Sequence, residues 1–118
     1  MRFGDLVKGA VAVWLAVAVG NVYAWDGAVT GKIAQINGVG GAGAAPGNYD
    51  IRVYIGGQAS VCAGAVDPSW GYININDPNY KGLLAMLLMA QATGKTVTLY
   101  TNKDSNGYCQ IGYIAVVT

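Results

Sequence analysis

The sequence predicts a mainly β domain with a single helix, placed behind a short N-terminal leader. Two observations carry this prediction. The first is a series of short segments in which apolar and polar residues alternate as they do in strands. The second is one long apolar segment that begins after a proline and ends at a glycine, as helices often do.

The first 24 residues have the pattern of a secretory signal peptide. Arg2 and Lys8 supply positive charge, and residues 10–20 form an apolar run of 11 residues, which is too short to span a bilayer. A small residue follows at Ala24, where a signal peptidase would cut. We therefore expect a secreted or periplasmic product without a membrane span. An uncleaved anchor is the alternative.

Cleavage there leaves residues 25–118, which we expect to form one small domain. Its charge is balanced, so it lacks the basic excess of a nucleic-acid-binding protein, and we expect no nucleic-acid partner. No run of like charges indicates an anionic membrane surface either. The charged residues of this part are Lys32, Arg52, Lys81, Lys95 and Lys103 against Asp26, Asp50, Asp67, Asp77 and Asp104.

Both cysteines, Cys62 and Cys109, lie in this domain. An even number of cysteines in an exported chain predicts one intrachain disulfide, with an intermolecular bridge or free thiols as alternatives. The bridge would close a loop of roughly 48 residues, which is worth about 4 kcal/mol in the chain-entropy model.

Five main strands are expected. The clearest is 49–55, where Ile51, Val53 and Ile55 alternate with polar residues. Asn106-Gly107 predicts a type I′ hairpin turn before the last strand. The expected strands are 29–37, 49–55, 70–75, 95–101 and 108–117, with a short additional strand over 59–63.

The helix is expected between Asp77, as its N-cap, and Gly94, as its left-handed C-terminal residue. Residues 82–90 contain no polar side chain, although a helix on a small sheet needs only one apolar stripe. We expect the second face to be buried in a homo-oligomer, and burial under a long loop is the alternative. The expected interface residues are Leu83, Met86, Leu87 and Met89.

A helix between the third and fourth of five strands is the element order of an OB-fold barrel, and we predict such a barrel. A ferredoxin-like or other α+β sheet is the alternative.

Three partial motif matches do not indicate a nucleotide or calcium site. Residues 38–43 fit G-x-G-x-x-G but lead into the strand at 49–55, whereas a nucleotide site needs a helix there. The Gly-Lys-Thr at 94–96 ends a helix, whereas that of a P-loop begins one. Residues 102–107 resemble the start of a calcium loop, but Tyr113 stands where the bidentate Glu belongs.

The composition offers few of the residue types that catalysis needs. The sequence has no His and no Glu, and its aspartates stand mainly at expected turns and caps. A His-based triad or a His metal site is therefore excluded, and nothing brings two carboxylates together. We predict that the protein is not an enzyme, has no catalytic or metal-binding residues and uses no cofactor.

The aromatic residues are the remaining candidates for a binding site. Trp70, Tyr72 and Asn74 alternate along one face of an expected strand. Aromatic rings and amides suit sugars and protein interfaces, and OB-folds often bind ligands on this part of the sheet. We predict these three residues as the ligand-binding site. Ordinary packing between strands is the alternative for each of them.

The stretch from Cys62 to Thr101 resembles the B subunits of AB5 toxins of the subtilase-cytotoxin and typhoid-toxin type, and similar small exported bacterial proteins. It contains a Cys, a short loop, Ser69-Trp70-Gly71, an apolar helix and Thr93-Gly94 before a strand. The resemblance implies an OB-fold subunit of a ring that binds cell-surface glycans. It carries over no individual glycan-contact residue, and the apolar helix differs from one that lines an open pore.

Together these patterns predict a non-catalytic exported binding module, similar to a toxin B subunit. It would recognise a glycan or a protein receptor as a homo-oligomer, for example a pentamer. The alternatives are a structural or assembly subunit of an exported complex and a secreted inhibitor of another protein.

Overall fold

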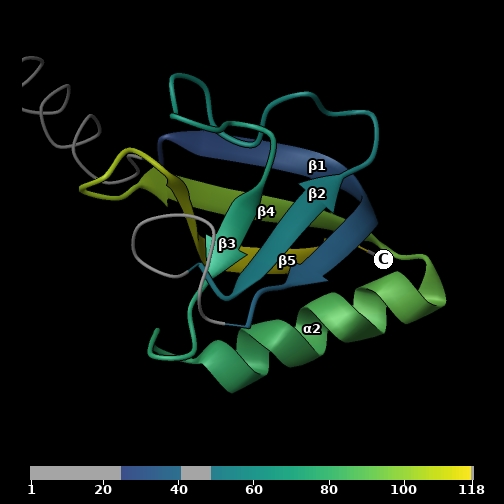
Figure 1. The fold of residues 1–118 in the computed structure, drawn as a ribbon. Coiled ribbons are helices and arrows are strands. Elements are labelled where there is room, and N and C mark those ends of the chain that lie inside the picture. Colours follow the sequence, from purple (N-terminus) through teal and green to yellow (C-terminus); the bar gives the residue numbers. More distant parts are fainter. Residues whose placement is uncertain (1–24, 41–48, 118) are drawn as a thin grey trace, which may run out of the picture.

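The computed structural model describes residues 25–40 and 49–117. In this part of the chain three strands precede one helix and two strands follow it (Figure 1). The elements are β1 (Gly27–Gly38), β2 (Ile51–Ile55), β3 (Gly71–Ile73), α2 (Tyr80–Thr93), β4 (Thr96–Lys103) and β5 (Cys109–Val117). The expected signal peptide lies outside the described residues. Within them, no helix has the length and hydropathy needed to cross a membrane.

The five strands form one closed sheet in the order β1-β2-β3-β5-β4, and β4 pairs back with β1. The long strand β1 makes closure possible, because Gly27–Lys32 pairs with β4 and Ile33–Gly38 pairs with β2. Neighbouring strands are antiparallel except β3 and β5, which run parallel and meet at Tyr72 and Gln110. The predicted mainly β fold with one helix after the third strand is therefore confirmed.

Alternation decides which side chains enter the interior of the sheet. Val53 and Ile55 of β2 are buried there, whereas Arg52 and Tyr54 lie on the outer face, as the sequence predicts. In β4 the buried residues also alternate, and the innermost polar one is Thr101. Its hydroxyl donates a hydrogen bond to the Val61 carbonyl at 3.4 Å, so this buried polar group is satisfied.

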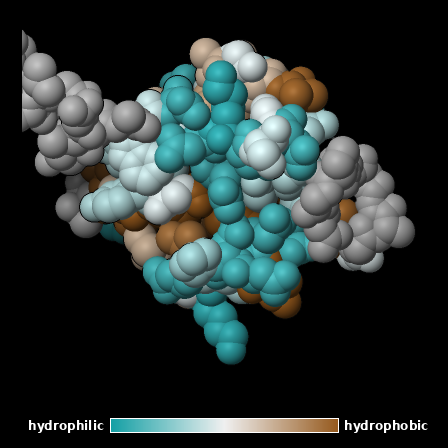
Figure 2. Space-filling view, turned by 90° about the vertical axis from the view of Figure 1, so that its left-hand side faces the viewer, coloured by the Kyte–Doolittle hydropathy of each residue, from teal (hydrophilic) through white to brown (hydrophobic). Residues whose placement is uncertain are grey.

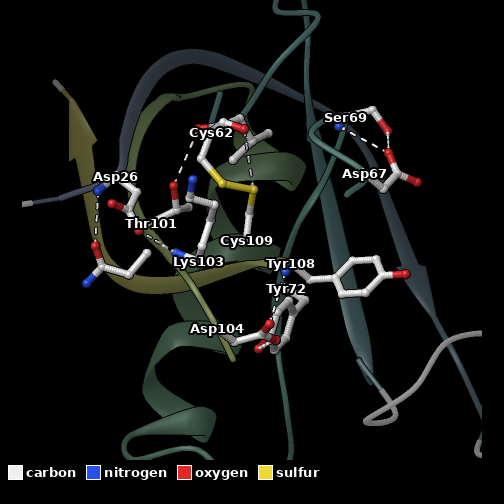
Figure 3. The surroundings of a disulfide bond; sticks show 12 residues. Asp26, Cys62, Asp67, Ser69, Tyr72, Thr101, Lys103, Asp104, Tyr108 and Cys109 are labelled. Atoms are coloured by element: carbon white, nitrogen blue, oxygen red, sulfur yellow. Dashed lines mark hydrogen bonds between the residues drawn. A yellow bond between two sulfur atoms is a disulfide. The ribbon is translucent and has the colours of Figure 1, made fainter. Parts of the chain in front are cut away.

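The predicted disulfide is confirmed. Cys62 and Cys109 are bonded, with 6.1 Å between their α-carbons, and both are buried in the core (Figure 3). The bond ties the long β2–β3 connection to the first residue of β5. The expected strand over 59–63 is absent, because this stretch turns around Cys62 instead of pairing with a neighbour.

The helix α2 lies across one end of the sheet, against β1 and β5 (Figure 1). Leu83, Leu87 and Ala90 are buried on the side that faces the sheet. Met86 packs partly buried against the same core, whereas Met89 is 46% exposed. This corrects the assignment of Leu83 and Leu87 to an oligomer interface, because one chain already covers their side chains.

The ends of the helix agree only in part with the prediction. Gly94 ends it in the left-handed region with φ 68°, as expected, and its N–H bonds the Gln91 carbonyl. The N-cap is Asn79, not Asp77. The Asp77 carboxylate is engaged elsewhere, since it accepts hydrogen bonds from the Asn74 N–H at 2.7 Å and the Gln110 side chain at 3.1 Å.

The turn between β4 and β5 also differs from the prediction. A type I′ turn needs positive φ at both central residues. Gly107 has a positive φ of 87°, but the φ of Asn106 is not positive. The Gly107 N–H bonds the Asp104 carbonyl at 3.0 Å, and the Asp104 N–H bonds the Tyr108 carbonyl at 2.8 Å. This is the pattern of a type I turn followed by a left-handed glycine.

Candidate ligand-binding site

The structure brings the predicted binding residues Trp70 and Tyr72 together, but inside the molecule. They are 4% and 3% exposed. They pack with Tyr49 and Tyr108 in a second buried cluster, separate from the core inside the sheet. The Trp70 and Tyr108 rings stack with centroids 5.6 Å apart, and the Tyr49 ring meets the Tyr72 ring edge-on at 4.4 Å. The rings of Tyr49, Trp70 and Tyr72 are buried against one another, and Tyr108 is partly buried beside them.

Polar groups also hold Trp70 in place. Its indole N–H donates to the Asp67 carboxylate at 2.8 Å, and the Arg52 guanidinium lies 4.7 Å from the ring centre, within cation–π range. The Ser69 hydroxyl donates to the same carboxylate at 2.6 Å. This bond from Ser69 is the main reason that the pKa of Asp67 lies below its usual value, and the bond from Trp70 adds to it.

Tyr72 is fixed by the β4–β5 turn. Its hydroxyl donates to the Asp104 carboxylate at 2.5 Å, and the same carboxylate accepts the N–H groups of Asn106 and Tyr108 (Figure 3). Burial opposes ionisation of Asp104, but these hydrogen bonds outweigh it and lower its pKa. Burial and the bond to this carboxylate both raise the pKa of Tyr72.

Asn74, the third predicted binding residue, is half-buried and also engaged within the chain. Its side-chain oxygen accepts the Asp50 N–H at 3.0 Å. Among the described residues, the Tyr49 hydroxyl and one Arg52 nitrogen are buried without a hydrogen-bond partner. The predicted site is thus a tightly packed cluster, and its use for a ligand stays a prediction.

A more accessible site lies between the start of α2 and the paired ends of β4 and β5. It is a cavity of about 190 Å³ with apolar and hydrogen-bonding groups side by side. The lining residues are Trp25, Asp77, Pro78, Leu83, Asn102, Gln110, Ile111 and Gly112. We call this cavity the Trp25 pocket. Figure 2 shows the side of the molecule that carries the β4–β5 turn, where hydrophilic residues surround a smaller hydrophobic area.

The aromatic wall of this pocket is the indole ring of Trp25, which is 38% exposed. The ring lies over Gly112 and beside Tyr100, with ring centroids 5.8 Å apart. Gly112 falls at a shift of register, since Tyr100 pairs with Tyr113 while the next residue, Thr101, pairs with Ile111. The irregularity in β5 and the missing side chain together make the space that the indole occupies.

Amide groups supply the polar side of the pocket. Asn102 and Gln110 are paired across β4 and β5. The Asn102 oxygen accepts the Asp26 N–H at 3.0 Å, and the Gln110 nitrogen donates to Asp77 at 3.1 Å. These bonds fix both amides and do not use the Asn102 nitrogen, a donor, or the Gln110 oxygen, an acceptor. A ligand can therefore meet one oriented donor and one oriented acceptor beside an indole face.

A second, wider depression of about 390 Å³ lies where β1 ends and β2 begins. It is mainly apolar and is lined by Gly38, Val39, Gly40, Asp50, Ile51, Ile75 and Tyr80. The Gly-rich motif at 38–43 begins here, but its second half lies outside the described residues. Within the described ranges, no three His, Cys, Asp or Glu side chains lie close enough together to hold a metal ion.

The sequence patterns do not predict the Trp25 pocket, although one signal for it is present. Once the turn at 104–107 is placed, the hairpin register sets Asn102 opposite Gln110. Nothing in the sequence indicates that Trp25 folds over β5 to join them. Comparison with protein-family models, curated proteins and solved structures finds no match.

Proposed function

We propose that this chain is a non-catalytic binding module that recognises a glycan through the Trp25 pocket. The observation that carries the proposal is the half-exposed indole of Trp25 beside the fixed amides of Asn102 and Gln110. The carbon–hydrogen face of a sugar ring packs well on an indole, and its hydroxyls pair with amides. The cavity is smaller than pockets for drug-sized ligands, which favours a single ring.

The wider features of the chain support this proposal. The closed sheet with β3 parallel to β5, and the helix between β3 and β4, agree with an OB-fold, which commonly binds oligosaccharides. The buried disulfide fits an oxidising compartment and so favours secretion. We infer an exported protein of the toxin B-subunit type, acting on a surface glycan or receptor.

A homo-oligomer is part of this proposal, because multivalent rings strengthen weak binding to single sugars. The helix supplies its candidate contact, since Leu88 and Met89 are 49% and 46% exposed. The same observation favours the second candidate function, an assembly subunit that docks through α2 on a larger exported complex.

The test is a glycan array followed by NMR titration with the best ligand, using three forms of the protein. Trp25→Ala removes the aromatic wall and should abolish binding with little loss of stability. Tyr113→Ala is the matched control, because Tyr113 is an exposed aromatic of β5 outside the pocket. Equal loss in both variants, or no loss with Trp25→Ala, would contradict the proposed site.

A further inference from the structure

We propose that the Trp25 pocket takes an uncharged sugar ring and rejects acidic sugars, such as sialic and uronic acids. This inference rests on the proposed glycan binding and names the class of sugar. It follows from the charges and the hydrogen-bonding atoms that line the pocket.

The charge of the pocket lining disfavours an acidic ligand. Among the described residues that line the pocket, Asp77 is the one that is charged, and none is Lys or Arg. Its carboxylate is held at a fixed position by the Asn74 N–H and the Gln110 side chain. A ligand carboxylate would approach this like charge with no Lys or Arg side chain of the lining to offset it, and such a pairing acts against binding.

The surrounding charges do not reverse this conclusion. Asp26, next to Trp25, adds a second carboxylate, which accepts the Lys103 backbone N–H at 2.7 Å. The Lys103 ammonium reaches the loop at Gly64, where it lies 3.3 Å from the position of a β-carbon. Cleavage before Trp25 would add one α-amino charge, against the two carboxylates of Asp26 and Asp77.

The hydrogen-bonding groups of the pocket also favour a neutral sugar. The Asn102 nitrogen can donate, and the Gln110 oxygen can only accept. A sugar hydroxyl both donates and accepts, so neighbouring hydroxyls can satisfy both groups. A carboxylate only accepts, so a carboxylate in place of the hydroxyl that faces Gln110 would leave the Gln110 oxygen unpaired at the cost of its desolvation.

The experiment compares two probes that differ in one group, methyl β-glucopyranoside and its uronic acid, in which a carboxylate replaces the hydroxymethyl group. Binding to the processed protein is measured by NMR titration at pH 7, with methyl β-galactopyranoside as a second neutral probe. We expect each neutral sugar to bind at least roughly tenfold more tightly than the uronic acid. The difference should shrink between low and high salt, because screening weakens like-charge repulsion.

Asp77→Asn then tests the cause, because it removes the charge and keeps one acceptor oxygen, which can serve Gln110 while the bond from the Asn74 N–H is lost. This variant should bring the neutral and acidic probes closer together. If it does not fold, the salt dependence of the unchanged protein decides the same question. Tighter binding of the uronic acid would overturn this inference and leave glycan binding standing. No binding of either class, or binding that Trp25→Ala leaves intact, would overturn both.

Discussion

The indole ring of Trp25 occupies the space that a side chain would fill at Gly112. A β-carbon built on Gly112 would lie 2.7 Å from Cζ3 of the ring and 2.9 Å from Cη2. The backbone of Gly112 has no positive φ, so the glycine is required here for space and not for conformation. The wall of the Trp25 pocket therefore depends on a missing side chain in β5.

Gly112→Ala should displace the Trp25 ring and weaken sugar binding. Its indole N–H signal in ¹H–¹⁵N NMR should shift, while that of Trp70, bonded to Asp67, should stay in place. We expect a stability loss of about 1 kcal/mol, because the ring can swing toward solvent. Gly40→Ala is the control, since a β-carbon there meets nothing within 4 Å. An unmoved Trp25 signal would show that the ring does not rest on Gly112.

The stability of the fold should fall in acid through Asp104. Its folded pKa is lowered, so its carboxylate stabilises the fold above the unfolded pKa of about 3.9. That contribution is lost as the pH falls through the folded pKa. Asp104→Asn should cost on the order of 1–3 kcal/mol at pH 7 and flatten the acid limb of the free energy of unfolding. Urea unfolding from pH 7 to pH 2 measures both effects.

Tyr72→Phe provides the control for this prediction. It removes the hydroxyl that bonds Asp104 but keeps the ring in the aromatic cluster. The two single variants and the double variant form a cycle, and a coupling energy near zero would show that this hydrogen bond is not the source of the acid dependence.

The disulfide should be a large part of the stability of this domain. Cys62 and Cys109 are 47 residues apart, so removing the bond should lower the free energy of unfolding by about 4 kcal/mol in the chain-entropy model. The double variant Cys62→Ala, Cys109→Ala tests this by urea unfolding. In the unchanged protein both thiols should resist alkylation until a reductant is added. Rapid alkylation of the oxidised protein would contradict the bond.

The two faces of α2 should respond differently to a buried charge. Leu87→Asp should abolish folding, because Leu87 is fully buried and an unpaired carboxylate there costs several kcal/mol. Met89→Asp should change stability by less than about 1 kcal/mol, because Met89 is 46% exposed. Light scattering on a sizing column gives the mass of each folded form.

For the oligomer, the unchanged protein should have the mass of a defined assembly, and Met89→Asp should reduce it to a folded monomer. A monomer for the unchanged protein at low and high concentration would contradict the oligomer. An assembly that Met89→Asp leaves intact would place its interface away from this face of the helix.

Local patterns were enough to place most elements of the fold. Alternation in 49–55 predicted which residues of β2 enter the core, and Gly94 marked the end of the helix. Local patterns failed where a side chain had a competing partner. Asp77 did not cap the helix because Gln110, 33 residues away, and the Asn74 N–H hold its carboxylate. The sequence does not show which of two possible partners a polar side chain will bind.

The order of strands and helix and the pairing of the two cysteines can be predicted from the residues alone, because they follow from local periodicity and from simple counting. Which aromatic residues are accessible depends on tertiary packing. Trp70 and Trp25 have the same side chain, but the β4–β5 turn and the loop at Asp67 close over Trp70, while Trp25 is left on the surface beside Gly112. Alternation assigns a side chain to one face of a sheet. Whether that side chain is then buried depends on which distant segments of the chain pack over the face.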